Sequence, residues 1–196
     1  MGQHLVAAKD DLRRRLLAAR AARTAEARAS AGVALGERLL TADLVAGART
    51  VAAFVSFGAE PPTSPFLDAC LATGVRVLVP LVRPAGVLDW AELDGSDLRP
   101  GGLGIPEPTG RPLGTSALST ADVVLVPALA VDPAGHRLGR GAGYYDRALA
   151  GLRDGVPRIA VVFDDELLPH VPTEPHDVPV THHLTPSTPL TPTSSR

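Results

Sequence analysis

Short apolar runs separated by helical segments constrain the fold of this chain more than any other feature of its sequence. Five runs are rich in β-branched and aliphatic residues, and each reads as a strand: Thr50–Phe57, Arg76–Val82, Val87–Leu93, Ala121–Asp132 and Arg158–Asp164. Strands that alternate with helices are typical of a largely parallel sheet with helices on both faces. The sequence therefore predicts an α/β fold with three layers.

Helix signals lie between and before these runs. Residues 4–40 read as two helices, because their leucines recur at helical spacing with arginines on the other face. Residues 61–74 begin with proline and serine and end with glycine, which are helix start and stop signals. We also expect a helix over residues 144–152. Residues 95–120 are rich in glycine and proline and predict a long ordered loop.

The extent of the chain suits a single domain. It has 196 residues, 45 % of them hydrophobic, which is enough for a sizeable core. We expect one catalytic domain over residues 1–184. Residues 185–196 (TPSTPLTPTSSR) are dominated by serine, threonine and proline, and we expect them to be a disordered tail.

Charge and composition disfavour several classes of partner. The formal net charge is −2 and the chain holds four phenylalanines and two tyrosines, so neither a basic field nor base stacking favours nucleic acid. No apolar run approaches the roughly 20 residues needed to span a bilayer, and no signal peptide is evident. Cys70 is the single cysteine, which fits a reducing compartment. We expect a cytoplasmic enzyme that binds neither nucleic acid nor membrane.

The strongest chemical signal is the segment HRLGRGAGYYD, residues 136–146. Glycines at alternate positions, Gly139, Gly141 and Gly143, allow backbone N–H groups to turn toward a ligand without a Cβ in the way. Arg137 and Arg140 add bidentate donors, and a helix follows. The segment therefore predicts a phosphate site, whereas the plainer reading is a flexible turn with its arginines in solvent.

Two familiar phosphate motifs do not match this segment. A P-loop requires GxxxxGK[ST], and no lysine lies here. A dinucleotide-binding GxGxxG would need glycine at the position of Tyr144 and a strand directly before it. The predicted strand ends near Val131, several residues too early.

Other charged residues have both a functional and a plainer reading. Lys9 and Arg13 share one face of the first helix and could reach phosphates, but the many arginines around them favour a solvated basic face. Asp146 could cap a helix or bind Mg²⁺, and Asp177 is a candidate second ligand or a surface-turn acid. Glu60 follows a strand end, where it could bind a substrate amine or be an exposed loop acid.

The whole pattern resembles the 5-formyltetrahydrofolate cyclo-ligase family, also called 5,10-methenyltetrahydrofolate synthetases. The long segment LAVDPAGHRLGRGAGYYDRAL is similar to the family signature. The N-terminal K-x-x-x-R, FVSFGAEPPT, GIPEP and VPTEPHDVPV fall in the family's order around it. The resemblance covers most of the chain and implies a three-layer fold related to sugar-phosphate isomerases and CoA transferases.

The resemblance also implies an activity and a set of site residues. It implies ATP-dependent cyclisation of 5-formyltetrahydrofolate with Mg²⁺, through a phosphorylated formyl group, by a monomer or weak dimer. Arg140 and Lys9 would be catalytic. Asp146 and Asp177 would hold magnesium, and Val55, Glu60 and Tyr145 would contact folate. The residues implied around ATP are Lys9, Arg13, Arg137, Leu138, Gly139, Arg140, Gly141, Ala142, Gly143, Tyr144 and Tyr145.

The chain departs from the family pattern at three places. Ala142 stands where lysine is common, so one phosphate contact is missing from the loop. Leu103 stands where an aromatic ring is common, so pterin stacking lacks its ring at that position. Thr181 and His182 replace an acidic residue that usually follows the Val-Pro-Val stretch.

Two other functions remain open from the sequence. One is a non-catalytic folate-binding regulatory member of the family, which would bind folate without consuming ATP. The other is a sugar-phosphate enzyme on the same fold, in which the glycine segment would hold a substrate phosphate and Lys9 would have no role.

Overall fold

A central, mostly parallel sheet organises the molecule. The computed structural model describes residues 2–95 and 98–194. Within these residues the sheet has seven strands in the spatial order β11-β10-β9-β6-β1-β2-β3, with the outer pairs β2–β3 and β10–β11 antiparallel and all other pairs parallel. The strands, in that spatial order, are Thr191–Pro192, His182–Leu184, Arg158–Val161, Val123–Pro127, Thr50–Ala52, Arg76–Arg83 and Val87–Glu92.

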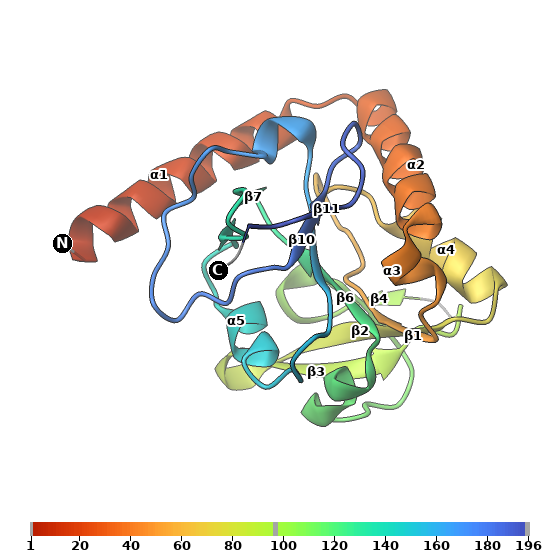
Figure 1. The fold of residues 1–196 in the computed structure, drawn as a ribbon. Coiled ribbons are helices and arrows are strands. Elements are labelled where there is room, and N and C mark those ends of the chain that lie inside the picture. The colour runs from red at the N-terminus through yellow and green to blue at the C-terminus, as the bar shows by residue number, and fades with distance from the viewer. Residues whose placement is uncertain (1, 96–97, 195–196) are drawn as a thin grey trace.

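Helices cover both faces of this sheet, as the sequence predicts. In Figure 1, α2 and α4 lie on one side of the strands and α5 on the other, while α1 runs along the top from the N-terminus. The helices are α1 (Gly2–Ala21), α2 (Ala25–Thr41), α3 (Asp43–Ala46), α4 (Ser64–Ala72) and α5 (Tyr144–Leu149). The predicted three-layer α/β fold is confirmed, and the two N-terminal helices are present.

Alternating side chains divide the core into two layers. In β2, Val77 and Val79 pack on the side of α2 and α4, whereas Leu78 faces the opposite cluster with Trp90 of β3. Trp90 is 1 % exposed and belongs to the layer that α5 and the 3₁₀ segment Thr115–Thr120 cover. Because period-two alternation places apolar residues on both faces, the central strands are buried on both sides.

Helix α1 packs on a smaller third cluster beside the sheet. Its Leu16 and Leu12 contact residues from the two-stranded pair β7 (Ala130–Val131) and β8 (Arg137–Leu138) and from the segment near Val171. The same helix carries Arg13 toward the segment that follows β8 and Lys9 toward residues 174–177. The position of α1 therefore determines where these two cations lie.

Three predicted segments differ in detail from the structure. β1 ends at Ala52, not at residue 57, because Thr63 and Glu60 bind the backbone of residues 54–57 and turn it away from the sheet. The run over residues 121–132 divides into β6 and β7. α5 ends at Leu149, three residues before the predicted end, and a turn containing Gly151 follows it.

The loop predicted over residues 95–120 contains regular structure. β4 (Leu98–Pro100) pairs antiparallel with β5 (Pro106–Pro108), and the 3₁₀ turn Gly102–Gly104 joins them. Leu103, at the tip, has a φ of 58° and is 69 % exposed. Residues 96–97 of this predicted loop lie outside the described residues.

The C-terminal segment also differs from the expected disordered tail. Thr185 is fully buried and, with Ser187, it donates hydrogen bonds to Asp164. β11 pairs with β10 at the edge of the sheet. The serine- and proline-rich composition does not predict this pairing, because the pairing depends on side-chain and backbone partners elsewhere in the chain. Residues 195–196 lie outside the described part of the chain.

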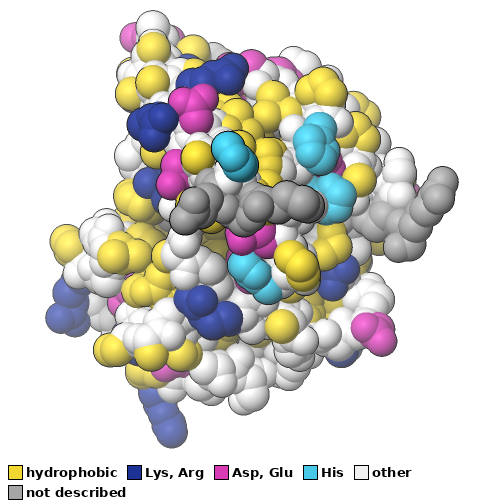
Figure 2. Space-filling view, turned by 90° about the vertical axis from the view of Figure 1, so that its left-hand side faces the viewer, with side chains coloured by type: hydrophobic (Ala, Val, Ile, Leu, Met, Phe, Trp, Pro, Cys, Tyr) yellow, Lys and Arg dark blue, Asp and Glu magenta, His cyan; other side chains and the backbone are white. Residues whose placement is uncertain are grey.

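The described helices include none that is long and apolar enough to cross a membrane. Figure 2 shows the side of the molecule that lies at the left in Figure 1, where acidic, basic and histidine side chains are interspersed among apolar ones.

Candidate active site

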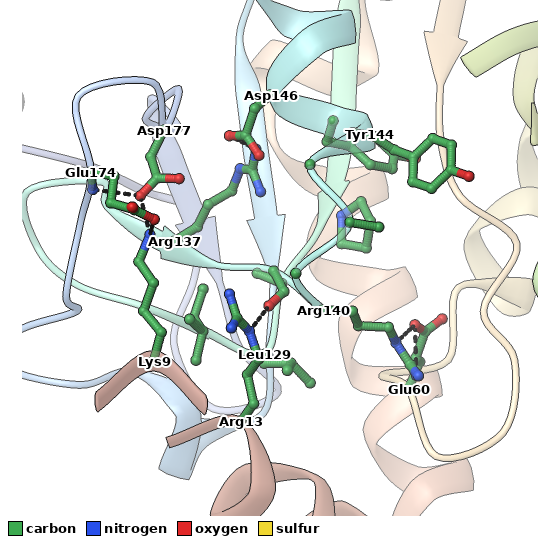
Figure 3. A pocket seen from close by; sticks show the side chains of 18 of the residues that line it. Lys9, Arg13, Glu60, Leu129, Arg137, Arg140, Tyr144, Asp146, Glu174 and Asp177 are labelled. Carbon is green, nitrogen blue, oxygen red and sulfur yellow. Dashed lines mark hydrogen bonds and ion pairs between the residues drawn. The ribbon is translucent and has the colours of Figure 1, made fainter. Parts of the chain in front are cut away.

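A pocket lies where the segments that follow β1, β6 and β8 meet α1. Its walls come from segments far apart in the sequence, which the parallel sheet brings together beyond the strand ends (Figure 3). The residues that line it are Lys9, Arg13, Arg20, Phe57, Glu60, Ile105, Pro127, Ala128, Leu129, Arg137–Asp146, Glu174, His176 and Asp177.

The glycine segment forms one wall of this pocket. Gly141 and Gly143 have φ values of 104° and 67°, which glycine adopts at little cost and other residues rarely adopt. Arg147 braces the segment from outside, since its guanidinium donates to the carbonyl oxygens of Ala142 (2.7 Å) and Gly86 (2.8 Å). A Cβ at position 143 would lie 2.9 Å from Arg147 Nη1, so a larger residue would have to displace this guanidinium.

An ion pair between a buried arginine and a half-buried aspartate joins the two ends of this segment. Arg137 Nη2 donates to Asp146 Oδ1 at 2.5 Å, and that oxygen also accepts the backbone N–H of Val178 at 3.0 Å. Burial lowers the pKa of Arg137, although the nearby carboxylates of Asp146 and Asp177 oppose the change. Arg137 Nε is buried and has no hydrogen-bond partner among the described residues, so it remains available to a bound anion.

Lys9 meets two acids on the far side of the pocket. Its Nζ lies 2.6 Å from Asp177 Oδ2 and 2.8 Å from Glu174 Oε2, and the lysine is 4 % exposed. Burial would lower the pKa of Lys9, but its hydrogen bonds and the two negative charges outweigh burial and raise it. Lys9 is therefore a fixed cation held by acids from the 174–177 segment.

Arg13, from α1, and Arg140, within the glycine segment itself, make different contacts in the pocket. Arg13 Nε donates to the carbonyl oxygen of Gly139 at 3.0 Å. Arg140 turns away from that region and pairs with Glu60, with Nη2 at 3.1 Å and Nε at 3.2 Å from Oε1. Its guanidinium lies over the ring of Phe57, 4.8 Å from the centroid. Burial raises the pKa of Glu60, although Arg140 opposes the change.

Tyr145 brings a buried hydroxyl to the same pocket. The hydroxyl oxygen has no hydrogen-bond partner among the described residues, and burial raises the pKa of the phenol, so it stays protonated. A buried, unpaired hydroxyl that lines a pocket is available to a ligand.

A candidate cation site lies at the rim. Glu174, His176 and Asp177 offer ligand atoms that all lie within 4.8 Å of one another. Asp146 is outside this group and its Oδ1 is occupied by Arg137. Carboxylate oxygens suit magnesium, which takes one or two of them together with phosphate oxygens and water.

Comparison with protein families identifies the chain. A sequence model described as the 5-formyltetrahydrofolate cyclo-ligase family matches residues 6–186. The chain belongs to this family. Curated cyclo-ligases agree: the protein of Mycolicibacterium smegmatis is 48 % identical over 143 residues, covering 70 % of this chain and 74 % of the relative. That of Escherichia coli is 34 % identical over 172 residues, covering 86 % and 94 %.

Solved structures agree on the fold. The NMR structure of Aquifex aeolicus 5,10-methenyltetrahydrofolate synthetase superposes with a TM-score of 0.81 at 23 % identity, covering 96 % of this chain and 94 % of that one. A Mycoplasma pneumoniae 5,10-methenyltetrahydrofolate synthetase gives 0.72 at 19 % identity, covering 91 % and 99 %. At these identities the likeness concerns the fold alone.

The site residues predicted for a cyclo-ligase gather in one pocket, with one exception. The two cations of α1, the whole of 137–146, Glu60 and Asp177 line it. Val55 does not, because its side chain packs against the core cluster on the α2 and α4 side. Leu103 is also outside the lining.

Several lining residues were not predicted from the sequence. Phe57 lies three positions before Glu60, and the pairing of Glu60 with the Phe57 backbone is a contact that no motif reveals. Glu174 and His176 share the EPHD segment with Asp177. Their closeness in sequence to Asp177 was the one feature that could have predicted them. Arg20 gave no distinct signal among the other arginines of the first helix.

Proposed function

We propose that this member of the cyclo-ligase family converts 5-formyltetrahydrofolate and ATP to 5,10-methenyltetrahydrofolate, ADP and phosphate in this pocket. Family membership carries the proposal. It is supported by one cavity that combines a glycine segment and several cations, which suit a nucleotide, with a buried carboxylate, which suits the pterin.

The nucleotide would bind along the glycine segment. The three glycines carry no side chain that would shield their backbone N–H groups from a phosphate, and Lys9, Arg13 and Arg137 line the same pocket. Arg137 has a free, buried Nε, and Arg13 is oriented by Gly139. These groups position phosphates and neutralise their charge, which is most of what phosphoryl transfer needs from a protein.

The folate would bind at the opposite end, against Glu60 and Tyr145. Glu60 is 7 % exposed and offers a carboxylate, and Tyr145 offers an unpaired hydroxyl. A contact between folate and Val55, which the resemblance implies, has no support from the lining of the pocket.

The reaction would proceed in two displacements. The formyl oxygen on N5 attacks the γ-phosphorus of ATP, ADP leaves, and an iminium phosphate forms. N10 then attacks the same carbon, its proton is lost, and inorganic phosphate leaves as the five-membered ring closes. The protein would hold the two substrates in line, and Lys9 and Arg140 would stabilise the charge that develops on the transferred group.

Magnesium would bind next to the phosphates. Asp177 and Asp146 are the proposed ligands, and Glu174 is a further donor, since its carboxylate lies with that of Asp177 in the cation site at the rim. When bound, the ion would neutralise phosphate charge. Lys9 holds Asp177 in place at 2.6 Å through its own hydrogen bond.

A direct assay tests the proposal. Protein, Mg-ATP and 5-formyltetrahydrofolate are mixed in mildly acidic buffer and methenyl-folate absorbance is followed with and without ATP. We expect product only with ATP. Folate binding without ATP consumption would instead favour a regulatory folate-binding protein, and binding of sugar phosphates with no ATP requirement would favour a sugar-phosphate enzyme.

We also propose that the enzyme is a cytoplasmic monomer or weak dimer. Light scattering at several protein concentrations tests the assembly state.

A further inference from the structure

Arg140 occupies the folate end of the pocket, not the phosphate end. Its guanidinium contacts Glu60 at 3.1 Å and lies over the ring of Phe57. Figure 3 shows this pair on one side of the pocket, whereas Lys9, Arg137 and Asp177 gather on the other. The residue expected to stabilise the transferred phosphate is therefore engaged elsewhere in this structure.

The place that Arg140 fills has a specific chemistry. Glu60 supplies a carboxylate that is 7 % exposed, and Phe57 supplies an aromatic face that lines the same pocket. A guanidinium fits there because it is flat and has adjacent N–H donors along one edge. The 2-amino-pyrimidinone ring of a pterin is also flat, and its 2-amino group and N3–H present the same adjacent donors.

We propose that the pterin ring of the reduced folate binds against Phe57 and Glu60 by displacing Arg140, and that the displaced Arg140 then turns toward the phosphates of ATP. The inference deepens the proposed function and rests on it. Phe57 becomes the stacking residue for the substrate, and one carboxylate serves first the protein's own cation and then the ligand.

The position of Phe57 is fixed by its surroundings. Glu60 Oε2 accepts the backbone N–H of Phe57 at 3.2 Å, and Thr63 accepts the N–H of Ser56 and donates to the carbonyl of Phe54. These contacts hold the segment that carries the ring against the pocket. Leu103, at the tip of the β4–β5 hairpin, is 69 % exposed and lies outside the lining, so it offers no comparable surface.

The exchange links the two substrates. The Glu60 carboxylate is nearly buried and cannot bind the guanidinium of Arg140 and the pterin ring at the same place. Folate and Arg140 therefore compete for Glu60. Release of Arg140 adds a cation to the phosphate end when folate is present. Folate should therefore tighten the binding of ATP, and by linkage ATP should tighten the binding of folate by the same factor.

Kinetics of Phe57 variants test the stacking role. We expect Phe57→Leu to raise KM for 5-formyltetrahydrofolate roughly fivefold, the range of an aromatic contact, with KM for ATP changed less than twofold. Phe57→Tyr should restore the wild-type KM because it keeps the ring. The control is Leu103→Ala, which should leave both constants unchanged. A raised folate KM in Leu103→Ala with no change in Phe57→Leu would overturn the assignment.

Equilibrium binding tests the displacement. Calorimetry without ATP, at pH 8, compares 5-formyltetrahydrofolate binding to wild type and to Arg140→Ala. Removal of the competitor should tighten folate binding roughly threefold, the range of a partly exposed ion pair, even though turnover falls. The control is Arg15→Ala, an exposed arginine outside the pocket. Unchanged or weaker folate binding in Arg140→Ala would overturn the displacement.

The proposed function and the displacement of Arg140 are overturned by different results. If wild-type protein forms no methenyl-folate from ATP, the proposed function is wrong. If wild type is active but Arg140→Ala does not bind folate more tightly, the displacement alone is wrong. Side-chain exposure of 46 % at Arg140 makes loss of folding in the alanine variant a minor concern, and circular dichroism checks it.

Discussion

At the residue scale, the charged groups of the pocket are held in pairs that substrates would have to rearrange. Lys9 is bound by Asp177 and Glu174, and Arg140 by Glu60. Each pair compensates charges that would be costly to bury alone. The pairs therefore stabilise the charged groups of the pocket and place them within reach of a ligand.

Arg140→Ala should lower kcat by about a hundredfold to a thousandfold. A donor aimed at developing charge contributes about 3–4 kcal/mol to the transition state, and alanine removes it. Steady-state kinetics with saturating ATP and folate measure the effect. Arg15→Ala serves as the control, because that arginine is exposed on α1. A near-normal kcat for Arg140→Ala would show that the arginine has no role in phosphoryl transfer.

Asp177→Asn should remove part of the acid dependence of stability. Burial would raise the pKa of Asp177, but hydrogen bonds from Lys9 and from the Glu174 backbone, with the charge of Lys9, hold it below its ordinary value. A depressed carboxyl pKa stabilises the fold above the unfolded-state pKa near 4, and this contribution is lost as pH falls through the folded-state value.

The measurement for Asp177→Asn is urea unfolding as a function of pH. We expect the variant to be about 1 kcal/mol less stable at neutral pH, because the pair with Lys9 is partly exposed. The difference should shrink as pH falls below about 4, since protonated aspartic acid resembles asparagine. A constant difference across that range would contradict the stated origin of the pKa shift.

At the element scale, a buried ion pair fixes α1 on the domain. Arg20 donates to both carboxylate oxygens of Glu166 at 2.7 and 2.8 Å and to the carbonyl of Ala128 at 2.6 Å, and both side chains are almost fully buried. Lys9, Arg13 and Arg20 follow one face of the helix, at spacings of four and seven residues. The pair therefore sets the rotation and register with which α1 presents its cations to the pocket.

Glu166→Gln should destabilise the protein by about 3 kcal/mol, because it leaves the Arg20 charge buried without its partner. The double variant Arg20→Met/Glu166→Gln should recover part of the loss, since no charge is orphaned. Urea unfolding measures both. The control is Asp11→Asn, which breaks an exposed pair with Arg14 and should cost under about 0.5 kcal/mol. Equal effects of Glu166→Gln and Asp11→Asn would contradict the role of burial.

The sequence predicted elements best where a local pattern decides the structure. The central strands β2, β6 and β9 and the helices α1 and α2 follow from apolar periodicity. β1 is shorter than predicted because Thr63 and Glu60 bind the backbone of residues 54–57. Apolar periodicity does not predict such side-chain contacts. β11 was missed for a similar reason, since its partner β10 decides its structure.

At the scale of the whole molecule, the sheet brings together residues that the sequence separates widely. Lys9 and Asp177 are 168 positions apart, and their contact follows from where α1 and the 174–177 segment cross. The residues that the motifs assigned to the site all line the pocket except Val55, although other lining residues, such as Phe57 and Glu174, were not predicted. Motifs could not predict how those residues pair, because pairing depends on the three-dimensional distances between side chains. The engagement of Arg140 by Glu60 is the clearest example.

The single tryptophan has a practical consequence. Trp90 is 1 % exposed in the core layer beneath α5, and it does not line the pocket. Its indole is the one strong near-ultraviolet fluorophore of the chain, and loss of core packing would expose it to water and shift its emission to the red. Each urea titration described above can thus be followed through one intrinsic optical probe, without labelling the protein.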